Sequence, residues 1–141
     1  MLERTLSIIK PDAVQRNLIG AILKMIEEGG LRIVHMKRLR LSRQEAEIFY
    51  AVHRKRSFFG DLTGYLSSGP LVVSVLEGER AIQRYMALLG AANPRNADPK
   101  SIRGMYGQDV VANSVHGSDD EYGPDVAKAE IAFFFSEQEL V

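Results

Sequence analysis

Three histidines are the side chains in this sequence best suited to nucleophilic or acid–base chemistry near neutral pH, because the chain contains no cysteine. His35 lies in a strand-like segment and His53 near the end of a helical one, where a cation also stabilises a helix C-terminus. Both therefore have an ordinary structural interpretation. His116 follows a long polar stretch, and its small neighbours leave the imidazole accessible. A loop histidine is more often structural than catalytic, so His116 is at this point a candidate only.

Several cationic and aromatic side chains could bind an anionic ligand. Lys10, Arg56 and Arg103 could offer charge and hydrogen-bond donors to phosphate oxygens, although each taken alone is an ordinary surface charge. Phe58 could stack on a base or simply belong to the core. The acidic run Asp119-Asp120-Glu121 has the side chains of a metal site, but a solvated turn is the favoured interpretation.

Hydrophobic periodicity predicts alternating strands and helices through the first two thirds of the chain. Apolar, partly β-branched runs predict strands over residues 5–9, 32–41 and 71–76. Helical spacing predicts helices near residues 19–26, 61–66 and 82–89, the first ended by Gly29-Gly30 and the last by Gly90. Ser42 followed by Glu45 forms a capping box, which predicts a helix beginning there and running to about residue 53.

The C-terminal third combines a long polar segment with a final apolar run. Residues 91–114 are rich in Asn, Pro, Gly, Asp and Ser, and a loop of this length is usually functional or disordered. Pro124 suits the first turn of a short helix over residues 125–129, and the apolar residues 131–135 are expected to form the last strand. Four strands and about four helices predict one domain over residues 1–141, with helices packed on a split β-α-β sheet.

Bulk composition limits the function classes. The 141 residues are 45% hydrophobic and 26% charged, as in ordinary globular domains, which argues against wholesale disorder. Eighteen basic residues balance eighteen acidic ones, whereas nucleic-acid and membrane-surface binders usually carry a basic excess. Without cysteine there are no disulfides, thiol catalysis or cysteine-based zinc sites. Because no apolar run matches a membrane span and no signal-peptide core follows the N-terminus, the expected location is the cytoplasm.

Short motifs in a fixed order carry a specific resemblance. They read T-L-S-I-I-K-P-D at 5–12, Y-x-x-H-x-x-R-x-F-F at 50–59, S-G-P at 68–70, L-L-G at 88–90, N-P at 93–94, S-I-R at 101–103 and N-x-x-H-G-S-D at 113–119. Each motif is weak alone, but together, over residues 3–140, they resemble the nucleoside diphosphate kinase family. The resemblance implies a ferredoxin-like α/β (α+β) fold, with helices packed on a four-stranded antiparallel sheet.

The resemblance also implies an activity and assigns residues to it. The reaction is ping-pong transfer of the γ-phosphoryl group from ATP to a nucleoside diphosphate, through a pros-phosphohistidine at His116. Glu130 would orient the histidine ring, and Lys10 and Tyr50 would act beside it. The nucleotide-binding positions would be Lys10, Arg56, Phe58, Met86, Ala92, Arg103 and Asn113. An imidazole with an ordinary pKa of about 6.5 suits this task, because the neutral nucleophile is abundant at cellular pH.

The implied cofactor and partners follow from the same resemblance. Mg²⁺ would be carried on the nucleotide phosphates, with no ligands from the protein. The expected partners are ATP and other nucleoside tri- and diphosphates, with no membrane and no nucleic acid. Family members assemble as homotetramers or homohexamers, so a homo-oligomer is implied.

The sequence departs from the family pattern in its anion-binding positions. Met86 stands where the family has a phosphate-binding arginine, and Ala92 where it has a threonine. A lost charge-assisted contact costs about 1.5–3 kcal/mol, so we expect weaker nucleotide binding. Arg95, in a flexible turn, is better placed to compensate than Arg84, which occupies a different helix face from Met86.

Two further departures affect the surroundings of the site. Ser57 replaces the usual proline after Arg56, which should loosen the approach to Phe58. Extra residues at 120–124 lengthen the segment between the histidine and its orienting glutamate.

Two other functions remain open on the sequence. The first is a nucleotide-binding protein with reduced or lost kinase activity, which Met86 and Ala92 favour. Retention of the other site residues argues against it: His116, Lys10, Arg56, Arg103 and Asn113. The second is a nucleic-acid-binding regulator, which the zero net charge and the lack of a basic stripe disfavour.

Overall fold

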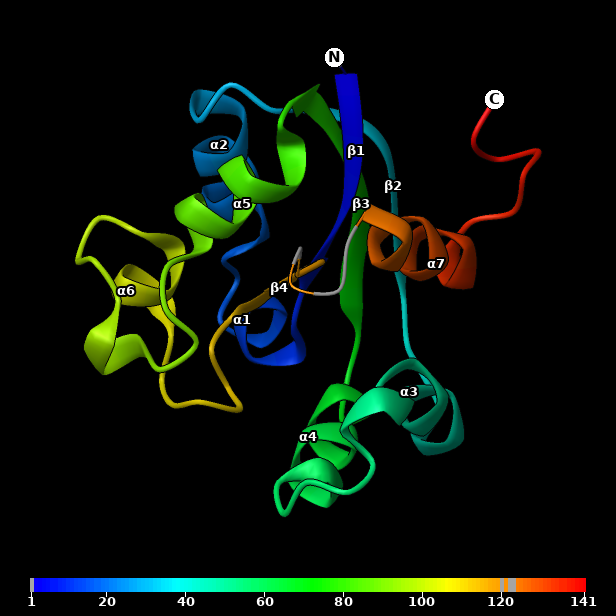
Figure 1. Ribbon diagram of the computed structural model, residues 1–141. Helices are drawn as coiled ribbons and strands as arrows, with labels where there is room; N and C mark the ends of the chain where they lie inside the picture. The colour runs from blue at the N-terminus through cyan, green and yellow to red at the C-terminus, as the bar shows by residue number, and fades with distance from the viewer. Residues whose placement is uncertain (1, 120, 122–123) are drawn as a thin grey trace.

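A four-stranded antiparallel sheet forms the centre of the computed structural model, which describes residues 2–119, 121 and 124–141. The strands are β1 (Leu2–Ile9), β2 (Arg32–Leu39), β3 (Leu71–Glu79) and β4 (Val115–Gly117). They lie in the order β2-β3-β1-β4, so β1 and β3 are central (Figure 1). The predicted four-stranded antiparallel sheet with helices packed on it is therefore confirmed.

Helices fill most of the connections between the strands. They are α1 (Pro11–Gln15), α2 (Ile19–Glu28), α3 (Arg43–Phe49), α4 (Phe59–Leu66), α5 (Ala81–Leu89), α6 (Ile102–Tyr106) and α7 (Pro124–Phe134), with 3₁₀ turns at Ala51–His53 and Pro94–Asn96. The predicted capping box begins α3: Ser42 Oγ accepts the Glu45 N–H at 3.0 Å, and Glu45 Oε1 accepts the Ser42 N–H at 2.9 Å.

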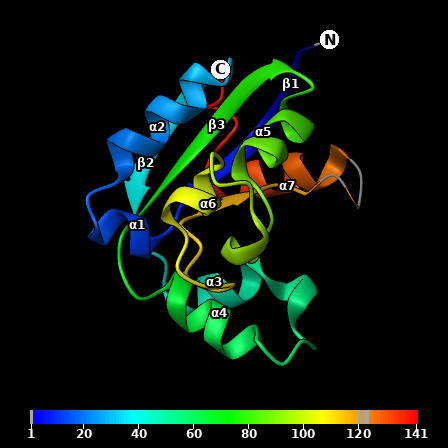
Figure 2. The same cartoon turned by 90° about the vertical axis from the view of Figure 1, so that its left-hand side faces the viewer.

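The strand side chains alternate between two apolar layers. On one face, Leu6 and Ile8 of β1 pack in a core with Ile131 of α7 and residues of α3 and α4. On the other face, Ile9 packs in a core with Ile22 of α2 and residues of α5. Both views place α3 and α4 together beyond one end of the sheet, away from α2 and α5 (Figure 1, Figure 2). The site described below lies where this helix pair, the sheet and α7 meet.

The C-terminal third differs from the sequence expectation. The apolar run over residues 131–135 was expected to be a strand, but it forms the last turn of α7 and the residue that follows. Ala127, Ile131 and Phe134 are buried at helical spacing, so a helical stripe covers the sheet here. The fourth strand is β4, whose three residues are too few to show a hydrophobic pattern. The expected loop at 91–114 contains α6, whose N-cap Ser101 accepts the Gly104 N–H at 3.1 Å.

Within the described parts of the chain, none of the helices has both the length and the apolar character needed to cross a bilayer.

Gly90 ends α5 with a left-handed φ of +84°, and a Cβ at this position would collide with the Ser101 side chain. We expect Gly90→Ala to lower the free energy of unfolding by about 1–3 kcal/mol, through backbone strain and overpacking. Gly20→Ala is the matched control, because Gly20 lies in α2 and a Cβ added there would meet no neighbouring atom within 4 Å. That substitution should raise stability by about 0.5–1 kcal/mol. Urea denaturation measures both, and equal effects of the two substitutions would contradict this interpretation.

Candidate active site

The middle residue of β4 presents the candidate nucleophile. His116 pairs with Ile8 of β1 in the antiparallel register, and directly opposed residues point to the same face of a sheet. The imidazole therefore projects toward the face covered by α7 and α3. Just before β4 the chain bends at Ser114, which has a φ of +79°, and the Ser114 carbonyl accepts the Lys10 N–H at 2.8 Å. The end of β1 and the start of β4 are thus joined beside the site.

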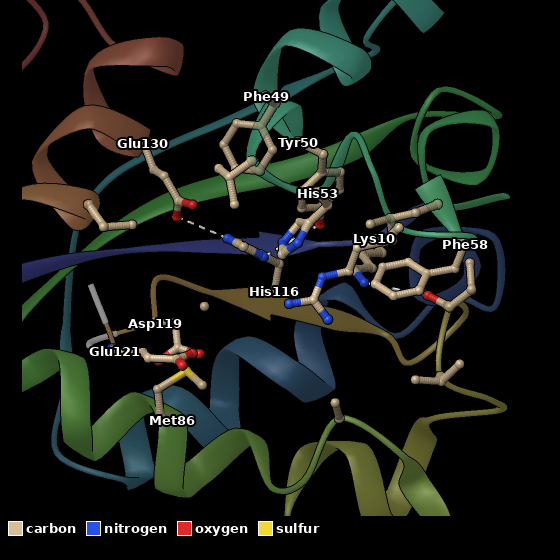
Figure 3. Close-up of a pocket in the computed structure, with 18 of the residues that line it drawn as sticks. Lys10, Phe49, Tyr50, His53, Phe58, Met86, His116, Asp119, Glu121 and Glu130 are labelled. Carbon is tan, nitrogen blue, oxygen red and sulfur yellow. Dashed lines mark hydrogen bonds and ion pairs between the residues drawn. The ribbon is translucent and has the colours of Figure 1, made fainter. Parts of the chain in front are cut away.

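Glu130 fixes one side of the imidazole. It lies on the buried stripe of α7, where its Oε1 is 3.0 Å from His116 Nε2 (Figure 3). The same oxygen accepts a 2.6 Å hydrogen bond from Ser118 Oγ. Burial alone would raise the pKa of Glu130, but the hydrogen bonds from His116 and Ser118 outweigh it and lower that pKa. An ionised carboxylate can only accept, so Nε2 carries the proton of the neutral ring. The lone pair is then on Nδ1.

The Nδ1 side of the ring is open. Tyr50 OH is 3.5 Å from Nδ1, which is too long for a strong hydrogen bond. Burial, followed by the Glu130 charge, raises the pKa of Tyr50, so its hydroxyl keeps its proton near neutral pH. The Phe49 ring meets the imidazole edge-on, with a centroid separation of 5.4 Å. Glu130, Tyr50 and Phe49 together fix the ring plane while leaving Nδ1 facing the cavity.

Lys10 places a buried amine at the same cavity. It follows β1 and is 3% exposed, and its Nζ donates to Asn113 Oδ1 at 2.9 Å and to the Val111 carbonyl at 3.4 Å. Burial, assisted by the positive charge of Arg103, lowers the pKa of Lys10 to about 7. Asp12 and Asp109 act in the opposite direction. The amine is therefore poised between its charged and neutral forms near physiological pH.

Arg103 of α6 is held by main-chain carbonyls. Its guanidinium donates to the Gly90 carbonyl at 3.1 Å and to the Val115 carbonyl at 3.0 Å, while its Nε is buried with no partner. Burial lowers the pKa of Arg103, although an arginine stays cationic at any physiological pH. These bonds make Arg103 a fixed cation on the cavity wall next to the strand that carries His116.

A cavity of about 670 Å³ brings most of the expected site residues together. Those that line it are Lys10, Tyr50, Arg56, Phe58, Met86, Ala92, Arg103, His116 and Glu130. At its mouth the Arg56 guanidinium lies 5.8 Å from the centroid of the Phe58 ring, which is 37% exposed. Met86 lies on the side of the cavity opposite Phe49 and Tyr50 (Figure 3).

Asn113 is the expected ligand residue that does not line the cavity. Its Oδ1 accepts from Lys10, and its Nδ2 donates to the carbonyls of Ala92 at 3.0 Å and Val110 at 3.2 Å. It therefore ties the Lys10 amine to two cavity-lining loops.

The two arginines considered as replacements for the missing cation at position 86 also lie outside the lining. Arg84 donates to the carbonyls of Gly29 at 2.8 Å and Glu79 at 3.3 Å, and Arg95 follows Pro94 in a 3₁₀ turn. Neither therefore lines the cavity beside Met86.

Sequence reasoning gave no site role to several residues that the fold brings to this cavity. Ser118, which bonds Glu130, lies two residues beyond His116, and alternation along an extended chain could have indicated the shared side. His53 lines the cavity with a buried, unpartnered Nδ1, and burial followed by the charge of Arg56 lowers its pKa. Asp119 and Glu121 line it too, but among the described residues no three His, Asp or Glu side chains form a metal-binding group.

The expected insertion at 120–124 falls largely outside the described residues, because Asp120, Tyr122 and Gly123 are not among them. Ser57 is exposed beside Phe58. Nothing in the structure shows a consequence of either departure for the position of Glu130.

An imidazole whose Nδ1 has only a long contact to Tyr50, facing a cavity with fixed cations and an aromatic mouth, can accept a phosphoryl group from a nucleotide. The nucleoside diphosphate kinase family model matches residues 3–140. The chain belongs to the nucleoside diphosphate kinase family. The resemblance seen in the motifs is thereby confirmed over essentially the whole chain.

Individual nucleoside diphosphate kinases resemble this chain over nearly all of its length. It is 54% identical to the one from Sinorhizobium fredii and 55% identical to the one from Maricaulis maris, each over 99% of this chain and 98% of the relative. The Aquifex aeolicus nucleoside diphosphate kinase structure superposes with a TM-score of 0.94 at 42% identity, covering 100% of both chains. The Halobacterium salinarum nucleoside diphosphate kinase in complex with CDP gives a TM-score of 0.92 at 40% identity, covering 99% and 91%. These matches confirm the ferredoxin-like fold expected for the family.

The lowered pKa of Lys10 predicts a pH-dependent stability. The unfolded chain holds the Lys10 proton up to about pH 10.4, whereas the folded chain releases it near pH 7, so stability rises with pH between these values. Lys10→Met should remove the Lys10 contribution to the rise of the free energy of unfolding with pH, which is at most about 1.4 kcal/mol per pH unit in this window. Urea titrations from pH 6 to about pH 10, with exposed Lys24→Met as the control, measure it. If the free energies of unfolding of wild type and Lys10→Met changed in parallel with pH, the lowered pKa of the folded Lys10 amine would be refuted.

Proposed function

We propose that this protein is a nucleoside diphosphate kinase that transfers the γ-phosphoryl group of ATP to nucleoside diphosphates through a phosphohistidine at His116. One observation carries the proposal: Glu130 engages Nε2, and Nδ1 faces the cavity. Membership of the nucleoside diphosphate kinase family supports the same reaction. Because one nucleophile serves both half-reactions, the kinetics are ping-pong.

The imidazole of His116 receives the phosphoryl group in one half of the reaction and gives it up in the other. In the first half, the Nδ1 lone pair attacks the γ-phosphorus, a P–N bond forms, and the bond to the β,γ-bridging oxygen breaks as ADP leaves. In the second half, a β-phosphate oxygen of another nucleoside diphosphate attacks that phosphorus and the P–N bond breaks. Glu130 stabilises the Nε2 proton as the ring gains positive charge, which is the orienting task of an acid beside a catalytic histidine.

The cavity residues supply binding and charge stabilisation. Arg103 and protonated Lys10 face the transferring oxygens, and Arg56 adds charge near the mouth. The Tyr50 hydroxyl, 3.5 Å from Nδ1, is positioned to donate to a phosphoryl oxygen that arrives there. Phe58 stacks on the base, which tolerates different nucleobases because every base has a π-face. Through its bond to Lys10, Asn113 is close enough to contribute to the sugar subsite.

A nucleotide kinase of this type uses a divalent cation, which we propose to be Mg²⁺ entering with the nucleotide as part of the substrate. The donor set fits this arrangement: Asp119 and Glu121 place carboxylate oxygens at the cavity, but among the described residues they belong to no group of three side chains that would hold the cation alone. The cation neutralises phosphate charge when bound. We further propose that the chain acts as a single domain within a homotetramer or homohexamer in the cytoplasm.

Labelling with [γ-³²P]ATP tests the proposed function most simply. The wild-type protein should form an acid-labile, alkali-stable phosphoenzyme that a nucleoside diphosphate discharges. His116→Ala should remain unlabelled, whereas His35→Gln, a change in β2 outside the cavity, should label normally. Nucleotide binding without label on the wild-type protein would instead support the binding-only alternative.

The position of Met86 in the cavity predicts a gain from restoring a cation. Met86→Arg should tighten nucleoside diphosphate binding about tenfold to a hundredfold, because a charge-assisted phosphate contact contributes about 1.5–3 kcal/mol. Calorimetric titration with ADP measures the effect. Met105→Arg is the control, since this exposed α6 residue adds the same charge away from the cavity. No difference between the two variants would show that the missing cation does not limit binding.

A further inference from the structure

A buried carboxylate beside Lys10 is fully engaged by partners other than Lys10. Asp12, at the start of α1, is 6% exposed. Its Oδ1 accepts a hydrogen bond from the Tyr65 hydroxyl, which in turn accepts the Asp12 N–H at 2.6 Å. Its Oδ2 accepts from Ser114 Oγ at 3.3 Å. Three elements therefore converge on one carboxylate: α1, α4 and the bend before β4.

The same carboxylate attracts the Lys10 charge without contacting it. Within the described residues, no hydrogen bond or ion pair joins Asp12 to Lys10, whose Nζ is turned instead to Asn113 and the Val111 carbonyl. The charged groups that act on Lys10 are Arg103 of α6, Asp12 of α1 and Asp109 of the loop before β4. A buried amine two residues from a buried carboxylate would ordinarily pair with it, because pairing offsets the desolvation of both groups.

We propose that Tyr65 is a positioning residue that holds the Asp12 carboxylate away from Lys10, so that the Lys10 amine stays available to nucleotide phosphates. The inference rests on the proposed function for the task of Lys10. It goes beyond that function by placing a residue of α4, which lies outside the cavity lining, in control of a cavity amine.

The physical reason is that the Asp12 carboxylate and a nucleotide phosphate compete for the same hydrogen-bond donor, the Lys10 amine. With the Tyr65 hydroxyl removed, Asp12 Oδ1 loses its donor inside the protein, and leaving a buried carboxylate oxygen unpaired is unfavourable. The carboxylate then turns toward Lys10, the amine that its charge already attracts. A phosphate must now displace Asp12 to reach the amine, so nucleotide binding weakens while the chemical step at His116 is left nearly unchanged.

The test is a double-mutant cycle on Tyr65 and Asp12. In Tyr65→Phe, NMR titration of the ¹³Cε signal of Lys10 in nucleotide-free protein should show its pKa raised by about 0.5–1. The KM for the nucleoside diphosphate should rise severalfold with little change in kcat. Asp12→Asn should lower the Lys10 pKa, and in Tyr65→Phe/Asp12→Asn the KM should return toward the wild-type value, because the competing carboxylate is gone.

Controls separate this role from simple support of the fold. Asp61→Asn removes an exposed carboxylate from the same helix as Tyr65 and should leave the Lys10 pKa and the KM unchanged. Ser114→Ala, which removes the second donor to Asp12, should act in the same direction as Tyr65→Phe and serves if Asp12→Asn fails to fold. A Lys10 pKa that rises in both Tyr65→Phe and Asp12→Asn, or a double variant worse than either single one, would overturn the proposal.

The outcome is independent of whether the protein is a kinase. The Lys10 pKa is measured without nucleotide, so opposite shifts in the two variants support the Tyr65 role even if ATP leaves no label on His116. Normal labelling of wild type with no shift in Lys10 would reject the Tyr65 role and leave the proposed function standing.

Discussion

The hydrogen bond between His116 Nε2 and Glu130 is the constraint on which the site depends. An imidazole has two chemically similar nitrogens, and only a fixed acceptor on one of them decides where the lone pair is held. Glu130 is ionised and only partly exposed on α7, and its second donor, Ser118, keeps it in place. If this acceptor were mobile, both tautomers would be populated and only part of the protein would present Nδ1 to the cavity.

The fold supplies this constraint from two distant parts of the chain. His116 stands on an edge strand whose register with β1 decides which face it occupies, and Glu130 stands on a helix packed against that face. A shift of one residue in the register of β4 would turn the imidazole to the α5 side, away from Glu130. The hydrogen bond from the Lys10 N–H to the Ser114 carbonyl fixes that register where β1 ends, and it joins the position of the cation to that of the nucleophile. At this edge of the sheet, the pairing of β4 with β1 therefore both stabilises the sheet and sets the geometry of the site.

Sequence patterns predicted the parts of this structure that depend on periodicity and capping. The β1 and β3 strands, the α2 and α5 helices and the capping box at Ser42 were all evident from apolar spacing and local hydrogen-bonding residues. The pattern failed for the apolar run at 131–135, because a run of this length fits either a buried strand or the core-facing stripe of a helix. It also missed β4, since a strand of three residues owes its existence to pairing with β1 rather than to its own composition. Among the site residues, the family resemblance indicated nine of those that line the cavity but not the other lining residues, such as His53 and Phe49. The Tyr65–Asp12 contact joins α4 to α1 and has no local signal in the sequence.

The location of phosphate on the imidazole tests the central claim most directly. Protein labelled with ¹⁵N-histidine and phosphorylated by ATP can be examined by ³¹P–¹⁵N correlation NMR under alkaline, denaturing conditions that preserve the P–N bond. The structure predicts that phosphorus couples to Nδ1 of His116, because Nε2 is bound to Glu130. Coupling to Nε2, or to a different histidine, would contradict the account.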